Sequence, residues 1–285
     1  MADQNTILVP IDFSEQSIIT LVQSYNLARE INAKITLVNV TEDYGLFNKY
    51  ISKNEQKEMK KNIEEKLNQL AEKKSKESGI KINTITAKGK IYAKIVEVAD
   101  MINATFIMMG TSGSMGIMKF IGSNTLRVVR ESKIPVISVK GKHHRVGCKN
   151  IVLPLDLTKE TREKVSKAIW LSGFYSEAVI RILSVSTTTD KYILNRHSRQ
   201  LKQVKDFIEK KGVKCTAETV KKDGRSLVQC ILDYANEVEA DLIMIMTQQE
   251  TDITEMFIGS AAQGIINNSE IPVMSIVPVP KKYVL

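Results

Sequence analysis

The chain has 285 residues, enough for one large domain or two ordinary ones, and 43% of them are hydrophobic. A chain of this composition can bury a sizeable core, which excludes wholesale disorder, and a formal net charge of +9 is only a modest basic excess. No apolar run approaches the roughly 20 residues of a membrane span, and the first residues lack the basic end and apolar stretch of a signal peptide. We therefore expect a cytoplasmic protein without a membrane partner.

The cysteines and the basic residues exclude several further classes. Cys148, Cys215 and Cys230 are odd in number and lack close spacing, which argues against a disulfide framework and against a zinc site. We expect reduced thiols and no bound metal from these residues. No basic block interleaved with aromatic residues stands out in the sequence, so nucleic acid is not an expected partner.

Short β-branched runs alternate with longer helical patterns in the first half of the chain. The predicted strands are 7–9, 35–40, 82–87, 106–109 and 136–139. The predicted helices are 16–31, 54–78, 92–103 and 123–132, and Gly79 is expected to end the second of them. Several of these strands are apolar on both faces, which is typical of buried parallel strands.

The second half repeats the first. Residues 7–13 and 151–157 share an apolar run followed by proline, an apolar residue and aspartate, and residues 120–123 recur as 257–260. Residues 134–139 likewise recur as 271–276. Three landmarks in the same order indicate two homologous domains, 1–143 and 147–285, joined by a polar, basic linker. Strands are expected near Ile151, Ile180, Cys215, Leu242 and Val273.

This alternation predicts an α/β fold with two tandem doubly wound domains. Each would be a five-stranded parallel sheet of order 3-2-1-4-5 with helices on both faces. In such a sheet the ligand crevice opens where the strand order reverses, here between the first and fourth strands. In the second domain we expect Trp170 to anchor the core beneath the first helix.

The residues after the fourth strand form a candidate phosphate cradle. Gly110 and Gly113 would let a backbone approach a ligand, and a side chain at Gly110 would fill that approach while the fold survived. Gly122, Ser123, Asn124 and Thr125 would then present backbone donors and hydroxyls at a helix N-terminus. An ordinary tight turn is the alternative for the glycines, and a helix cap is the alternative for Asp12.

These residues resemble the universal stress proteins, whose ATP-binding members carry G-x2-G-x9-G-[S/T] after the fourth strand and an aspartate after the first. The resemblance covers essentially the whole chain as a tandem pair. It implies that Asp12 holds the ribose hydroxyls, that Pro10, Ile11 and Val40 surround the adenine, and that the remaining motif residues bind ribose and phosphates. Those remaining residues are Met109, Gly110, Ser112, Gly113, Gly122, Ser123, Asn124 and Thr125.

Both copies depart from the family pattern. In the first, eight residues rather than nine separate Gly113 from Gly122. In the second, Met246 and Gln249 stand where the first copy has Gly110 and Gly113, although Asp156 and Gly259 are retained. We therefore expect one nucleotide site per chain, in the first domain, with Asp156 and Gly259 kept as fold residues.

The resemblance also implies partners and a function. Family members pair through their last strands, so we expect the two domains of one chain to pair with each other, and a homodimer is a further possibility. The leading hypothesis is an ATP-binding stress-response sensor or interaction module, with or without Mg²⁺, and with slow or no hydrolysis. The alternatives are a nucleotide hydrolase or adenylyl-transfer enzyme using Lys119 or Arg127, and an assembly module that binds no nucleotide.

Overall fold

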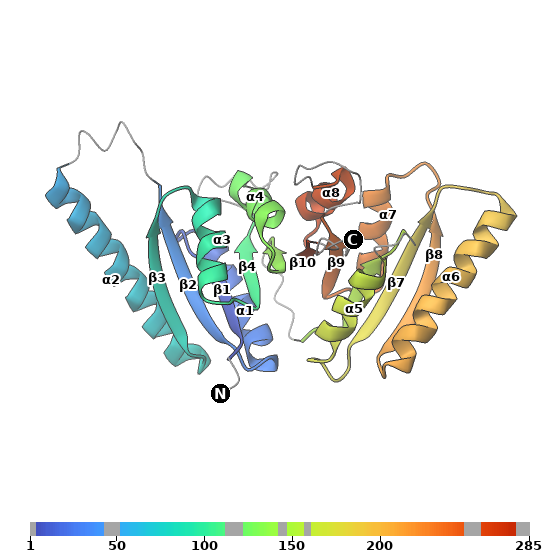
Figure 1. Ribbon diagram of the computed structural model, residues 1–285, viewed down its shortest axis with the longest axis horizontal. Helices are drawn as coiled ribbons and strands as arrows, with labels where there is room; N and C mark the ends of the chain where they lie inside the picture. Colours follow the sequence, from blue (N-terminus) through green and yellow to red (C-terminus); the bar gives the residue numbers. More distant parts are fainter. Residues whose placement is uncertain are drawn as a thin grey trace, which may run out of the picture. The chain divides into compact units, whose positions relative to one another are not determined.

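The computed structural model describes residues 4–42, 52–111, 122–141, 147–156, 161–247 and 258–277. The chain divides into two compact units, Met1–Val136 and Ile137–Leu285, with the division falling inside a strand. Each unit is an alternation of strands and helices (Figure 1).

The elements of the first repeat follow the predicted order, with ends that shift by one or two residues. They are β1 (Thr6–Pro10), α1 (Glu15–Glu30), β2 (Lys34–Thr41), α2 (Lys53–Ser78), β3 (Ile82–Lys88), α3 (Ile91–Met101), β4 (Phe106–Gly110), α4 (Ser123–Glu131) and β5 (Val136–Val139).

The second repeat has the same succession, and its strands include every position expected from the sequence. Its elements are β6 (Asn150–Pro154), α5 (Thr161–Ser172), β7 (Val179–Ser186), α6 (Lys191–Lys210), β8 (Lys214–Lys221), α7 (Leu227–Glu237), β9 (Leu242–Met246), α8 (Ser260–Asn268) and β10 (Val273–Ile276).

The strands are parallel and follow the predicted order in both repeats: β3-β2-β1-β4-β5 and β8-β7-β6-β9-β10. Ile7 of β1 lies between Ile35 of β2 and Phe106 of β4. Ile151 of β6 lies in the same way between Ile180 and Leu242. The strand order therefore reverses beside the first strand of each repeat, which places a crevice at that point.

Local sequence explains where the helices of the first repeat begin and end. Ser14 caps α1 by accepting a hydrogen bond from Ser17 N at 3.2 Å, and Ser52 and Glu55 form a capping box at the start of α2. Gly79 ends α2 in the left-handed conformation with φ of 72°, which confirms the expected cap.

Trp170 is not a core residue, contrary to the expectation from sequence. Helix α5 buries Val165, Ala168 and Leu171, which recur every three residues on its inner face, and Trp170 lies on the other side with 40% of its surface exposed. Its ring meets Phe174 edge to face at 5.2 Å between centroids. The helical phase around Trp170, rather than its size, decides its position.

Cys148, Cys215 and Cys230 are buried free thiols. Burial raises the pKa of Cys148 and of Cys215 to about 12, so neither is an activated nucleophile. None of the described helices is both long and apolar enough to cross a bilayer.

Candidate nucleotide site

A cavity of about 130 Å³ opens at the carboxyl ends of β1 and β4 in the first unit. Its walls come from both strands, from β2, and from the starts of α1, α3 and α4. The lining residues are Pro10, Ile11, Asp12, Ser17, Val38, Val40, Ile91, Ile95, Met109, Gly110, Gly122, Asn124 and Thr125. Residues from six separate elements thus converge at the point where the strand order reverses.

Nine of these lining residues are ones that the sequence singled out, and they are Pro10, Ile11, Asp12, Val40, Met109, Gly110, Gly122, Asn124 and Thr125. Ser123 is exposed and is not part of the lining. Ser112 and Gly113 lie outside the described residues, and so does the eight-residue segment before Gly122.

Four lining residues were missed by the sequence reasoning: Ser17, Val38, Ile91 and Ile95. Val38 lies two positions before Val40 on the same face of β2, so strand periodicity was a usable signal. Ile91 and Ile95 share one face at the start of α3, and nothing in their local sequence distinguishes them from core residues.

Asp12 organises the turn between β1 and α1. Its Oδ1 accepts hydrogen bonds from the backbone N of Ser14 at 3.0 Å and from Ser14 Oγ at 2.5 Å. Phe13 between them adopts φ of 62°, a left-handed conformation that is uncommon outside glycine. Since Ser14 caps the helix, the carboxylate of Asp12 is left exposed at the mouth of the cavity.

Gly110 lines the cavity and also lies close against α1, a contact that the sequence did not reveal. A Cβ at this position would lie 2.9 Å from Gln16 Cγ, 3.1 Å from Thr20 Oγ1 and 3.4 Å from the carbonyl oxygen of Gln16, all in α1. The absent side chain therefore lets α1 pack against the end of β4. A side chain at Gly110 would therefore also press against α1, so we expect it to cost some stability as well as to fill the approach to the cavity.

At the start of α4 the N-cap residue provides no side-chain hydrogen bond to the first-turn N–H groups. Its N-cap is Gly122, which has no side chain to accept from the first-turn N–H groups. The corner is held by Gly122 N, which donates to Thr111 O at 2.7 Å, and by Thr125 Oγ1, which donates to Gly110 O at 3.0 Å. This fixed corner aims the positive end of the helix at the cavity.

The second unit preserves the corner but fills it differently. Gly259 N donates to Thr247 O at 3.1 Å, as Gly122 N does to Thr111 O, which aligns Met246 with Gly110. The side chain of Met246 is almost fully buried. At the end of β6, Lys164 of α5 donates through Nζ to the carbonyl oxygen of Pro154 at 3.1 Å. Gln249, the second departure from the pattern, lies outside the described residues.

Charged groups are scarce in the cavity. Asp12 is the single ionisable side chain among its described lining residues. Arg127 is not among the lining residues, and its guanidinium lies over the ring of Tyr92 at 5.0 Å from the centroid. Lys119 lies outside the described residues, and the described part of the chain contains no cluster of three or more potential metal ligands.

The fold and the crevice define a tandem α/β protein of the doubly wound class. The profile of the universal stress protein family matches residues 4–140 and again 147–276. A universal stress protein of Methanocaldococcus jannaschii is 31% identical over 146 residues, covering 47% of this chain and 81% of that protein. The chain therefore belongs to the universal stress protein family, as a tandem member.

Solved structures support the same fold over the full length. A universal stress protein of Archaeoglobus fulgidus aligns over 97% of both chains with a TM-score of 0.76 and 22% identity. A Pseudomonas aeruginosa protein that is assigned to the universal stress proteins aligns over 96% of this chain and 94% of its own, with a TM-score of 0.70 and 16% identity. An Archaeoglobus fulgidus universal stress protein in complex with dAMP aligns over 45% of this chain and 96% of its own, with a TM-score of 0.38 and 21% identity.

Proposed function

We propose that the first unit binds an adenine nucleotide, with ATP as the ligand, in the cavity at the ends of β1 and β4. In this proposal the protein is a cytoplasmic stress-response sensor or interaction module rather than a fast enzyme. The observation that carries the proposal is that nine residues singled out from the sequence line one cavity, although they come from β1 and the turn after it, β2, β4 and the start of α4.

The chemistry of the walls suits the parts of a nucleotide. Val38, Val40 and Ile95 give the inner wall an apolar character that suits a flat purine ring. A volume of about 130 Å³ is below the roughly 300–1,000 Å³ of most ligand pockets, so it suits the base rather than the whole nucleotide. The sugar and phosphates would lie at the mouth.

The mouth has one acidic and one electropositive side. The carboxylate of Asp12 can accept hydrogen bonds from both ribose hydroxyls, since carboxylates are acceptors only. The N-terminus of α4, with Asn124 in its first turn, favours the phosphates. Mg²⁺ would arrive on the triphosphate, where it neutralises charge between phosphate oxygens.

Slow or absent turnover follows from the same lining. Phosphoanhydride hydrolysis calls for a positioned water, a catalytic base and cations that stabilise the transferring phosphoryl group. Among the described lining residues Asp12 is the single ionisable group, and its Oδ1 is engaged by Ser14. A bound nucleotide in such a site acts as a ligand that shifts conformation or partner choice.

We place one site in each chain, in the domain comprising residues 1–143, and none in the domain comprising 147–285. The support is the buried side chain of Met246 at the position of Gly110 and the departure at Gln249. We further propose that the two domains pair through their last strands, β5 and β10, as single-domain members of the family pair. The whole chain could instead form a homodimer, and a measurement of the molecular mass in solution distinguishes this assembly from pairing within one chain.

Titration of the full-length protein with ATP, in the presence and absence of Mg²⁺, tests the proposal. Asp12→Asn keeps the oxygen that accepts from Ser14 and removes the charge, so affinity should fall about 10- to 100-fold. Asp156→Asn is the matched change in the second unit and should leave affinity unchanged. Wild-type protein that binds no adenine nucleotide, or equal losses in both variants, would overturn the proposal and favour a nucleotide-free assembly module.

A further inference from the structure

Helix α6 of the second unit carries an unbalanced positive charge. Its 20 residues contain six Lys or Arg and two acidic residues. The corresponding helix of the first unit, α2, contains eight Lys and six Glu in 26 residues. In α2 the charges also pair along the helix, as in Lys60–Glu64 and Lys61–Glu65, each at 3.6 Å. The two repeats share a fold, so this difference is not required by the architecture.

The helical fold gathers these charges on the side that faces solvent. Leu201 and Ile208 are buried and mark the inner side of α6. Arg196, Arg199 and Lys202 are exposed and fall within an arc of about 120° on the opposite side. They span about 9 Å along the helix axis at 1.5 Å per residue.

Aromatic side chains accompany these cations. Tyr192, one turn before Arg196, is 76% exposed and lies near the middle of the same arc. Phe207 further along the helix is 43% exposed, with Lys211 Nζ 5.9 Å from its ring centroid. We call Tyr192, Arg196, Arg199 and Lys202 the α6 outer face.

The cations of this face have no ionic partners within the described part of the chain. The ion pair of α6 among the described residues joins Lys205 and Glu209 at 3.6 Å. Arg196, Arg199 and Lys202 make none there. Cations that the protein does not pair internally remain available to an anionic ligand.

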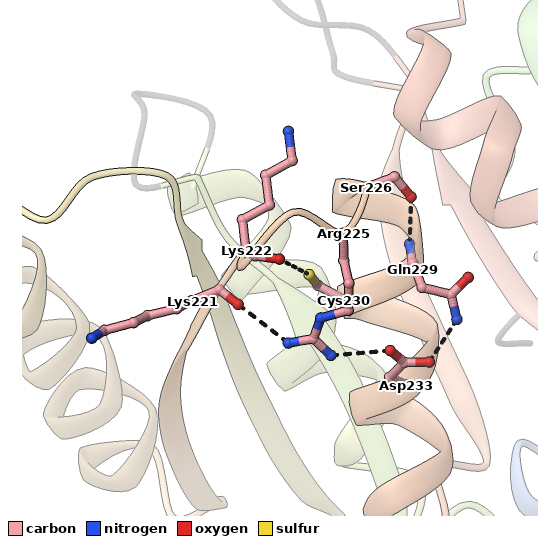
Figure 2. A network of polar contacts seen from close by, with 7 residues as sticks. All are labelled: Lys221, Lys222, Arg225, Ser226, Gln229, Cys230 and Asp233. Carbon is pink, nitrogen blue, oxygen red and sulfur yellow. Dashed lines mark hydrogen bonds and ion pairs between the residues drawn. The ribbon is translucent and has the colours of Figure 1, made fainter.

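Another basic segment of the same unit differs, because its arginine is paired within the protein. Arg225, between β8 and α7, forms an ion pair with Asp233 at 3.1 Å and donates to the carbonyl oxygen of Lys221 (Figure 2). Gln229 donates to the other carboxylate oxygen of Asp233 at 2.6 Å. Arg225 therefore fixes the start of α7 and is not counted with the α6 outer face.

We propose that the α6 outer face binds a single-stranded nucleic acid, with its cations on the phosphates and Tyr192 as a stacking platform. Arginine suits phosphate because its planar guanidinium donates two parallel hydrogen bonds. An exposed aromatic ring stacks on unpaired bases of any sequence. The sequence alone did not reveal this pattern, because residues that stand three or four apart share a face only in the helix.

An anionic membrane is a poorer match for the same face. Helices that bind membranes insert an apolar face below the headgroups. Leu201 and Ile208 of α6 are buried within its own unit. The exposed apolar side chains of α6, Tyr192, Ile193 and Phe207, do not form a continuous stripe, because about four turns separate Phe207 from the other two. A stacking residue also favours a single strand over a duplex, whose bases are stacked on each other.

The test is fluorescence anisotropy of full-length protein with a labelled 20-nucleotide oligo(dU), at several salt concentrations. Three phosphate contacts predict that the logarithm of the association constant falls with a slope of about −2 against the logarithm of salt concentration. Substituting Arg196→Glu, Arg199→Glu and Lys202→Glu together should weaken binding by at least about tenfold at low salt. Tyr192→Ala should weaken it about 5- to 100-fold, the contribution of one stacked base.

The control variant makes the same change of net charge on a different helix, α2. Substituting Lys57→Glu, Lys60→Glu and Lys61→Glu on α2 should leave binding within about twofold, with the fold of both triple variants checked by circular dichroism. Equal losses in the two triple variants, no binding by the wild type, or tighter binding to a duplex or to anionic vesicles would each overturn the proposal. Asp12→Asn should not alter oligonucleotide affinity, so this result stands apart from the nucleotide site.

Discussion

Gly110→Ala is expected to destabilise the first unit through a collision with α1. The new Cβ would lie 2.9 Å from Gln16 Cγ and 3.1 Å from Thr20 Oγ1. Thr20 is fully buried and its hydroxyl donates to Gln16 O at 2.8 Å, so it has little room to move. A Cβ contact below 3.0 Å is essentially never found in real structures, so the Gln16 side chain or α1 must move to accommodate the methyl group.

The size of the effect can be bounded. Overpacking of this kind costs about 1–3 kcal/mol of unfolding free energy. Alanine also restricts the unfolded chain, which offsets about 0.4–1 kcal/mol, so the central values of the two ranges leave a net loss of roughly 1–2 kcal/mol. For a chain of this size that loss lowers Tm by roughly 2–8 °C.

A double-mutant cycle with Gln16→Ala tests the cause directly. Gln16→Ala removes the Cγ atom nearest to the added methyl group, so Gly110→Ala should cost less in that background, with a coupling of at least about 0.5 kcal/mol. Urea unfolding of the four proteins supplies the measurement. An equal loss of unfolding free energy in both backgrounds would refute the collision with Gln16. Lost ATP binding at unchanged stability would do the same and would indicate that Gly110 serves the nucleotide site alone.

Three further predictions concern other parts of the molecule. Thr125→Val removes the hydrogen bond to Gly110 O and should lower the free energy of unfolding in urea by about 1–3 kcal/mol. Thr125→Ser keeps the hydroxyl and should keep most of that stability. Equal stability of the two variants would contradict this prediction. Tyr25 has its pKa raised from 10.0 to about 12, chiefly by burial, so the native state holds its proton longer than the unfolded state. The stability that this group contributes is therefore present below pH 10 and is lost as the pH rises toward 12. In a series of unfolding curves, Tyr25→Phe should flatten the decline of the unfolding free energy over this pH range. An unchanged slope would argue against burial as the cause. The single tryptophan, Trp170, is 40% exposed, so acrylamide should quench its fluorescence in the native protein, and a native spectrum insensitive to acrylamide would place it in the core after all.

Much of the fold could be predicted from sequence because its signals are local and repeated. The apolar runs at the start of β1 and β6 define buried parallel strands, and the matching landmarks fix the two repeats. Helix ends shifted by one or two residues, since caps such as Ser14 depend on backbone geometry rather than on apolar periodicity.

The candidate site was predicted less completely, for a physical reason. Pro10, Asp12 and Thr125 carry motif signals, and they do converge on one cavity. Ile91 and Ile95 join them through the packing of α3, which no local pattern encodes. The contact of Gly110 with α1 could not be predicted either, because a glycine in the sequence does not reveal which neighbouring helix lies against it.

The most direct measurement is a crystal structure of the full-length protein grown with a non-hydrolysable ATP analogue. The proposal predicts a purine against Val38 and Val40, ribose hydroxyls on Asp12, and phosphates at the start of α4, in the first unit alone. Density for the analogue in the second unit, or none in the first cavity at concentrations that saturate binding in solution, would contradict it.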